Sequence, residues 1–159
     1  VFIISKGRKT NLADMGMGTN QLMVLLFSLA TIMFEEGYHG KDGGRSYIPK
    51  FIIIEEPEQN LHPRLQSKLA DLILDVTKDP SYRFLIETHS EYLIRRTQVL
   101  VAEMGLEETD LEKQNPFKVY YFPEDSRPYD MKYRKDGCFV NEFGSGFFDE
   151  ASNLAFKLF

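Results

Sequence analysis

The most informative segment of this chain runs from Phe51 to Pro63 and reads FIIIEEPEQNLHP. An unbroken apolar run of strand length, bounded by polar residues and proline, is typical of a strand buried on both faces of a parallel α/β sheet. Ligands of such open sheets bind beyond the carboxyl ends of the strands, where Glu55 and Glu56 follow the isoleucines. The segment therefore predicts a central strand with two carboxylates at the ligand-binding edge of its sheet.

The two adjacent carboxylates allow a catalytic and a structural interpretation. Because side chains alternate along a strand, we expect Glu55 and Glu56 to point in different directions. One could hold a metal ion while the other orients or deprotonates a water molecule, which is the division of labour that nucleotide hydrolysis around Mg²⁺ needs. The alternative is a solvated strand end before a helix N-terminus, where the helix dipole favours acidic residues.

Composition limits the classes of protein that the chain can represent. Its 159 residues are 43% hydrophobic and 27% charged, as in an ordinary soluble globular domain. The net charge of −5 argues against a broadly basic surface for nucleic acid. A single cysteine, Cys138, fits a reducing compartment, so we expect a cytoplasmic protein. We find no signal peptide, and the apolar run 22–34 is too short to cross a bilayer, so we expect a buried helix and no membrane.

A glycine-containing motif precedes that apolar helix. It consists of Gly16, Met17, Gly18, Thr19, Asn20 and Gln21. Glycines let a backbone approach a ligand closely, and a helix N-terminus offers unpaired N–H groups to an anion. The motif lacks the third glycine of a dinucleotide fingerprint and follows a polar loop, so a Rossmann site is rejected. The structural interpretation is a flexible entry to a capped helix.

A second strand-to-helix junction carries a histidine. The segment 82–87 is a predicted strand ending in Thr88-His89-Ser90, and Ser90 is a good N-cap for a helix over 91–104. A helix from Pro63 to about Lys78 connects the two predicted strands. In a parallel sheet His89 would therefore lie beside the first junction, although a lone histidine is more often a packed or capping residue.

The remaining segments are less distinctive. We expect a strand over 1–6, a polar connection over 7–13, a glycine-rich loop over 37–46, an acidic connector over 106–115, short strands over 117–123, 129–134 and 138–140, and a final helix over 151–158. Gly40-Lys41 is followed by Asp42, where a phosphate-binding Walker A loop requires Ser or Thr, and no other segment supplies such a loop.

The order of these motifs resembles the C-terminal half of an ABC-type ATPase head. It is most similar to the OLD-like (overcoming lysogenization defect) prokaryotic ATPases, relatives of the SMC, Rad50 and RecF ATPases. The motif 16–21 would match the signature motif, 52–56 Walker B, 58–63 the D-loop region and His89 the switch histidine. The resemblance implies an α/β fold, a partial P-loop NTPase with a parallel sheet and flanking helices over 1–115, followed by a small β-rich C-terminal extension over 116–159.

The resemblance also implies roles for these residues. Glu55 would help to hold Mg²⁺, in the place of the Asp of most Walker B motifs, and Glu56 would be the general base or water-orienting residue. His89 would touch the γ-phosphate of ATP. Gly16, Gly18, Thr19, Asn20 and Gln21 would act in trans on ATP held by another subunit of a homodimer. The chain's ending resembles a domain of unknown function that closes some of these ATPases.

Because it lacks a Walker A loop, the chain is expected to need a second segment that supplies one. In such ATPases it lies in an N-terminal half, and the start of this sequence without methionine looks like the middle of a larger polypeptide. We therefore expect no ATP turnover by this chain alone. The leading interpretation is an ATPase lobe that switches an attached effector, with a role on DNA or in phage defence that the resemblance implies. The alternatives are a non-catalytic interaction module that recruits a partner, and a metal-dependent hydrolase built on Glu55, Glu56 and Glu58.

Overall fold

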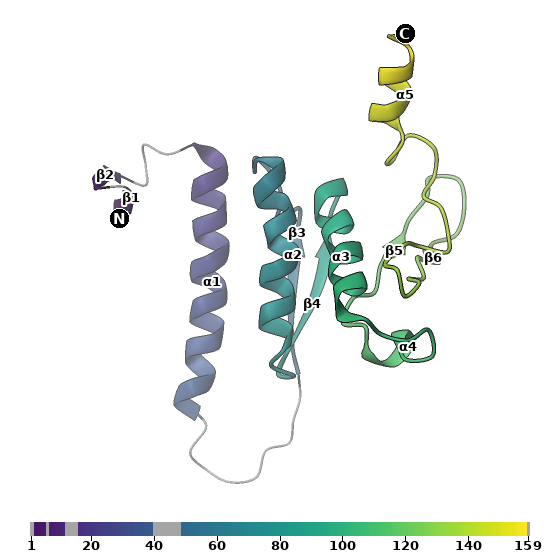
Figure 1. Cartoon of the computed structure of the whole chain (residues 1–159). Helices are drawn as coiled ribbons and strands as arrows, with labels where there is room; N and C mark the ends of the chain where they lie inside the picture. Colours follow the sequence, from purple (N-terminus) through teal and green to yellow (C-terminus); the bar gives the residue numbers. More distant parts are fainter. Residues whose placement is uncertain (1, 6, 12–15, 40–48, 159) are drawn as a thin grey trace.

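The computed structural model describes residues 2–5, 7–11, 16–39 and 49–158 (Figure 1). Its elements in chain order are β1 (Phe2–Ser5), β2 (Arg8–Asn11), α1 (Met17–His39), β3 (Lys50–Glu55), α2 (Pro63–Thr77), β4 (Tyr82–Glu87), α3 (Glu91–Met104), α4 (Leu111–Gln114), β5 (Tyr120–Tyr121), β6 (Tyr129–Asp130) and α5 (Glu150–Phe156).

Strands β3 and β4 form a parallel pair that runs in register from Lys50 opposite Tyr82 to Glu55 opposite Glu87. Helix α2 makes the crossover between them, and α1 and α3 stand on either side of α2 (Figure 1). The prediction of two neighbouring parallel strands is thus confirmed. The chain is a mixed α/β structure with a small parallel sheet and flanking helices, compatible with part of a P-loop fold.

The helices cover one face of this sheet and leave the other open. On the covered face Ile52 and Tyr82 are buried in a cluster with Leu29 of α1 and Val76 of α2. On the opposite face the large side chains Phe51, Ile53 and Leu85 are 61–70% exposed. The expectation of a strand buried on both faces is therefore wrong for the described part of the chain, because only one layer of helices packs on the sheet there.

Helix α1 is longer and more exposed than expected. It starts five residues before the predicted run 22–34 and continues five residues beyond it. The expectation that this segment is too short to cross a bilayer is therefore wrong for the length of the helix. Among the described residues it alone is long and apolar enough to cross a membrane, with a mean hydropathy of 1.5 over Met17–Phe34. Core helices of soluble proteins pass the same test. Only 11% of this window is buried, so the predicted buried helix is not observed.

Helices α2 and α3 begin as the sequence predicts. The His62 side chain caps α2, its Nδ1 accepting from the Arg64 N–H at 3.2 Å, and Pro63 occupies the first turn. Ser90 caps α3, its Oγ accepting from the Leu93 N–H at 3.0 Å. Each cap satisfies a backbone donor that the helix itself leaves unpaired. These local signals fix where both junctions of the sheet turn into helix.

The α2–α3 pair is held by an apolar core and an ion pair. Leu69 of α2 packs with Leu93 and Leu100 of α3 in one buried cluster. Beside it Arg96 donates to Asp71 through Nη2 at 2.7 Å and Nε at 3.1 Å. The hydrogen bond from Arg96 holds the pKa of Asp71 below its usual value. The two helices therefore form one rigid layer behind the sheet.

The two ends of the lobe differ in part from the predicted pattern. The expected first strand is present as β1, but the expected polar connection 7–13 contains β2, which pairs antiparallel with β1. Of the predicted glycine-rich loop, residues 37–39 belong to α1 and 40–46 lie outside the described residues. The connector 106–115 contains the short helix α4. A hairpin and a single helical turn are both too short for a hydrophobic period to reveal them.

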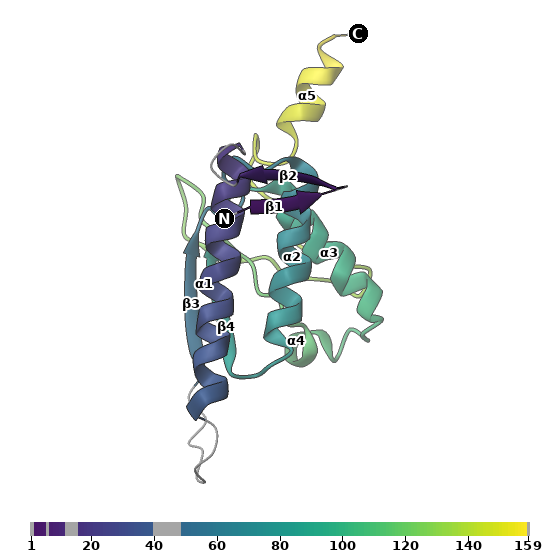
Figure 2. The same cartoon turned by 90° about the vertical axis from the view of Figure 1, so that its left-hand side faces the viewer.

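The C-terminal segment packs on α3. Strands β5 and β6 pair antiparallel, and an isolated bridge joins Tyr133 to Phe139, so the predicted β layer is present in shorter form. The Tyr133 hydroxyl and Thr97 Oγ1 are 2.7 Å apart in the buried contact with α3. Phe143 and Phe148 pack against the α2–α3 core. Helix α5 projects away from the rest of the chain (Figures 1 and 2).

Gly137 provides a test of the contact between the C-terminal segment and α3. Its φ is +79°, and a Cβ there would lie 2.0 Å from the Gln98 carbonyl oxygen of α3. Gly105 has a similar φ of +62° but open space around it. We predict that Gly105→Ala lowers the free energy of unfolding by about 1–2 kcal/mol, because alanine is strained in the left-handed conformation. Gly137→Ala should lower it clearly more, as measured by urea unfolding. Equal losses would show that Gly137 does not pack on α3.

The buried phenol of Tyr133 should make the stability of the fold depend on pH at high pH. Thr97 Oγ1 donates to the Ile94 carbonyl at 2.7 Å, so the phenol of Tyr133 donates to Thr97. Burial raises the pKa of Tyr133 from 10.0 to about 12. The folded state thus favours the neutral phenol, and this stabilisation is complete below pH 10 and is lost as the pH rises toward 12.

We predict that Tyr133→Phe lowers the free energy of unfolding by about 1 kcal/mol at neutral pH through the lost hydrogen bond. Its stability should then fall less than that of the wild type between pH 10 and about 12. Denaturant unfolding across this range measures both effects. Tyr120→Phe, at an exposed position, is the control. Parallel pH curves for wild type and Tyr133→Phe would contradict the buried phenol.

Candidate functional site

The carboxyl edge of the parallel sheet, where β3 and β4 end, brings two predicted site segments together. The Glu56 N–H donates to the Glu87 carbonyl at 2.9 Å, so the ladder extends one residue beyond the last paired residues of β3 and β4. The chain then turns into the loop before α2 on one side and into Thr88-His89-Ser90 on the other. The edge is therefore fixed by backbone pairing.

Glu56 and His89 face each other at this edge. His89 Nε2 lies 3.6 Å from Glu56 Oε1, and the two side chains are 69% and 43% exposed. Both groups therefore contact each other and remain open to solvent. A carboxylate can accept a hydrogen bond from a water molecule, and an imidazole N–H can donate one to a phosphate oxygen. The structure thus brings together Glu56, the predicted general base or water-orienting residue, and His89, the predicted contact to the γ-phosphate.

The turn after β3 holds the Glu56 carboxylate. Glu56 has a φ of +44°, in the left-handed region that non-glycine residues rarely adopt. The Gln59 N–H donates to the Glu56 carbonyl at 3.0 Å, and Gln59 Nε2 donates to Glu56 Oε2 at 3.2 Å. Strain of this kind, about 1–2 kcal/mol, persists where the surroundings enforce it, and it is frequent at functional sites.

Glu55 occupies a different position from Glu56. It belongs to the exposed face of β3 with Phe51 and Ile53, and it lies opposite Glu87 in the register. No hydrogen bond or ion pair engages its carboxylate within the described part of the chain. Glu55 is therefore available to an external cation.

Glu58 is buried, although the next two residues of the turn, Gln59 and Asn60, are polar and exposed. Only 7% of the residue is exposed, and its Oε1 accepts from the His89 N–H at 2.7 Å. The described residues contain no group of three side chains that could hold a metal ion. The alternative of a three-glutamate hydrolase centre is therefore wrong for this part of the chain, because Glu58 turns inward to the backbone of His89.

The motif 16–21 lies at the start of α1, against the turn that follows β3. A Cβ on Gly18 would lie 2.1 Å from the Asn60 carbonyl oxygen, whereas Gly16 has open space around it. Asn60 Nδ2 donates to Gln21 Oε1 at 3.3 Å. Gly18 thus allows α1 to contact the turn around Asn60 in the same chain, which the sequence did not predict. Thr19 and Asn20 are half-buried in the first turn of α1, and Asn20 Oδ1 has no partner among the described residues.

A hydrogen-bonded link joins the two strand-to-helix junctions behind the edge. Ser90 Oγ donates to Gln66 Oε1 at 2.6 Å, and Gln66 Nε2 donates to the Leu61 carbonyl at 2.9 Å. The link ties the start of α3 to α2 and to the end of the loop after β3. It restrains His89 and Glu56 relative to each other. Sequence analysis did not identify Gln66, because a glutamine on a helix carries no distinctive pattern.

The donors at the edge fit part of a magnesium–nucleotide site. Mg²⁺ is usually bound by one or two carboxylates together with substrate phosphates, so Glu55 would suffice as the acidic ligand without a three-carboxylate cluster. The His89 imidazole supplies a hydrogen-bond donor for a phosphate oxygen. A cradle of backbone N–H groups for the remaining phosphates is not formed by these residues.

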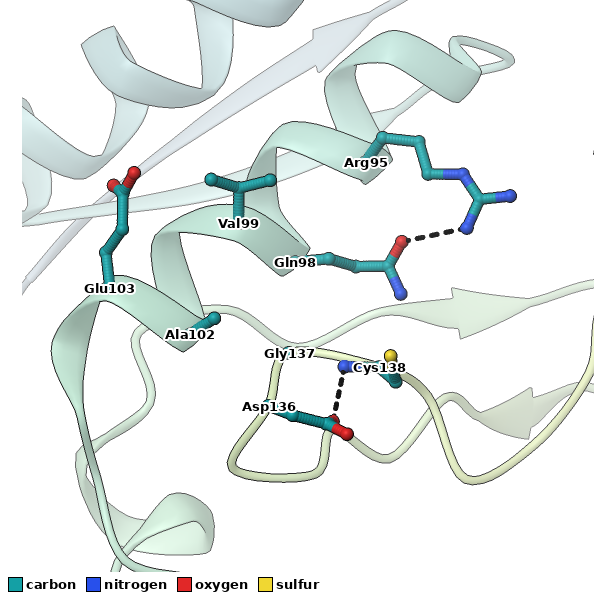
Figure 3. A pocket seen from close by; sticks show the side chains of 8 residues that line it. All are labelled: Arg95, Gln98, Val99, Ala102, Glu103, Asp136, Gly137 and Cys138. Atoms are coloured by element: carbon teal, nitrogen blue, oxygen red, sulfur yellow. Dashed lines mark hydrogen bonds between the residues drawn. The ribbon is translucent and has the colours of Figure 1, made fainter.

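A shallow pocket elsewhere on the molecule does not involve these residues. It lies between α3 and the turn before Phe139 and is lined in part by Arg95, Gln98, Val99, Asp136, Gly137 and Cys138 (Figure 3). Its polar groups pair with one another: Arg95 donates to Gln98 at 3.2 Å, and the Cys138 N–H donates to Asp136 at 2.9 Å. The pocket therefore offers no convergent set of free polar groups.

Comparison with known proteins identifies the class. Residues 2–94 match the family of the AAA ATPase domain, so the chain belongs to this family of ATPase domains within the P-loop NTPases. The match contains every predicted site residue and ends in the first turn of α3. Such domains use a nucleotide and typically Mg²⁺. Neither a curated protein nor a solved structure matches the chain.

The two glycines of the motif provide a matched test of its local role. Gly18→Ala should push α1 away from Asn60, because the added Cβ meets a backbone carbonyl. Hydrogen exchange should then accelerate in the first turn of α1 and in residues 59–61. Gly16→Ala has room for its methyl group and should leave exchange unchanged. Identical exchange in both variants would contradict the contact.

Proposed function

We propose that this chain is the C-terminal lobe of an ABC-type ATPase head that contributes Walker B acids, a switch histidine and a signature motif to an ATP site. The observation that carries the proposal is the 3.6 Å contact of Glu56 and His89 at the ends of neighbouring parallel strands. This contact lies within the segment that matches the AAA ATPase domain family.

The proposed roles follow the positions of the side chains. Glu56 orients or deprotonates the attacking water, since its carboxylate is held by the turn yet 43% exposed. His89 contacts the γ-phosphate, and its imidazole is 69% exposed at the same edge. Glu55, without a partner in the described chain, helps to hold Mg²⁺, which neutralises phosphate charge when bound.

The proposal includes an N-terminal half of the same protein that carries the Walker A loop. The sequence contains no Gly-x-x-x-x-Gly-Lys-Ser/Thr pattern, so the phosphate-binding lysine must come from elsewhere. The exposed face of the parallel sheet supports this, because Phe51, Ile53 and Leu85 are 61–70% exposed. Burying each such side chain contributes about 1.5–3 kcal/mol, so a second layer on this face is favourable. The exposed apolar side chains of α1 also favour packing against an N-terminal half.

The assembly and the branch of the family also belong to the proposal. Gly16, where an added Cβ would meet no described atom within 4 Å, and the half-buried Thr19 and Asn20 of the first turn of α1 are proposed to act in trans across a homodimer. The resemblance to the OLD-like ATPases supports a cytoplasmic prokaryotic protein with roles on DNA or in phage defence, and a C-terminal domain shared with some of these ATPases. These assignments rest on the order of motifs.

The second candidate is a non-catalytic interaction module. Helix α5 projects from the body (Figure 2), and its Leu154 and Phe156 are 52% and 80% exposed. This favours recruitment of a partner by the C-terminal segment. The two candidates differ in whether the complete protein hydrolyses ATP.

ATP hydrolysis separates the candidates directly. We predict no turnover by this chain alone, and turnover by the complete protein that joins it to its N-terminal half. Glu56→Gln should lower kcat at least about a hundredfold, the usual contribution of a general base. Glu112→Gln on α4 removes an exposed charge far along the chain and is the control. Undiminished turnover in Glu56→Gln would contradict the proposal, and absence of turnover in the complete protein would favour the interaction module.

A further inference from the structure

Glu58 is the one charged side chain that is buried among the residues the structure describes. Burying a carboxylate is unfavourable unless hydrogen bonds replace its hydration. One donor is present, the His89 N–H at 2.7 Å from Oε1. The second oxygen, Oε2, is buried without a donor from the described residues. An incompletely paired buried carboxylate calls for an explanation beyond packing.

The backbone around Glu58 is shaped to direct this carboxylate inward. Glu56 and Asn60, on either side of it, both have positive φ values, +44° and +59°. The turn between them therefore contains two strained positions. Its geometry places the Glu56 side chain at the open edge and the Glu58 side chain beneath His89. The same turn thus contacts His89 through two carboxylates, one at the imidazole and one at the backbone N–H.

We propose that Glu58 is a positioning residue, which holds the main chain of His89 and so sets the imidazole against Glu56. This inference rests on the proposed ATPase function and deepens it. Oε1 fixes the His89 N–H, while the adjacent Thr88 Oγ1 accepts from the Ser90 N–H at 3.0 Å. The backbone on both sides of the His89 Cα is therefore restrained. The position of the imidazole is then determined mainly by side-chain rotation.

The contact itself is tested on the 159-residue chain by hydrogen exchange of the His89 amide. Glu58→Ala removes the acceptor and should lower protection on the order of tenfold to a hundredfold, the value of a hydrogen bond to a charged group. Glu58→Gln keeps a hydrogen-bond acceptor, so the protection of the His89 amide should lie between those of the wild type and Glu58→Ala. Glu91→Gln removes a nearby carboxylate that pairs with Arg95 and should change nothing at His89. Unchanged protection in Glu58→Ala would overturn the proposal.

The action through His89 is tested by steady-state ATP hydrolysis of the complete protein. Glu58→Ala should lower kcat about tenfold or more with little change in KM, and Glu58→Gln should restore part of the loss. In a His89→Ala background Glu58→Ala should cause no further loss, because the group it positions is absent. A purely structural role would lower kcat equally in both backgrounds and would overturn the proposal.

The two proposals fail in distinguishable ways. Turnover that is abolished by Glu56→Gln but unaffected by Glu58→Ala would support the ATPase function and overturn the positioning role. Turnover that is insensitive to Glu56→Gln would overturn the ATPase function, and with it the catalytic meaning of Glu58. If Glu58→Ala does not fold, the Glu58→Gln variant provides the test. Full protection of the His89 amide together with full kcat would overturn the proposal. Partial loss of both would support it.

Discussion

The parallel pairing of β3 with β4 is the interaction on which the rest of the site depends. Six residue pairs in register, from Lys50–Tyr82 to Glu55–Glu87, fix the level at which both strands end. A shift of one residue would move every side chain to the other face of the sheet. The pairing therefore determines that an acid from one strand end meets the imidazole from the next, and no flexible loop has to bring them together.

The layer behind the sheet keeps this edge rigid. Caps by His62 and Ser90 define where the two helices start, and the Gln66 link joins them beneath the edge. The Asp71–Arg96 pair and the apolar core hold α2 against α3. The C-terminal segment packs on α3 through Tyr133 and the phenylalanines. Helix α3 thus connects the His89 junction at one end with the C-terminal segment along its length.

Sequence patterns predicted the elements whose signals are local. The apolar run 51–54, the period of α2 and the Ser90 cap each depend on neighbouring residues, and these elements lie where expected. Parallel pairing followed from the βαβ order, which in turn placed His89 beside Glu56. The burial of Glu58 and the packing of Gly18 on Asn60 were not predicted, because they arise from contacts between segments about 31 to 42 residues apart. The exposure of α1 was also not predicted. An apolar run indicates a segment that favours burial, but it does not identify the segment or partner that buries it.

The most direct measurement of the central claim is the scalar coupling across the hydrogen bond between the Glu56 amide nitrogen and the Glu87 carbonyl carbon, observed by NMR on the isotopically labelled chain. In-register parallel pairing predicts a detectable coupling, since the N–H and carbonyl oxygen are joined at 2.9 Å between nitrogen and oxygen. Coupling of the Glu56 amide to a different carbonyl, or rapid exchange of this amide with solvent, would contradict the shared edge and separate Glu56 from His89.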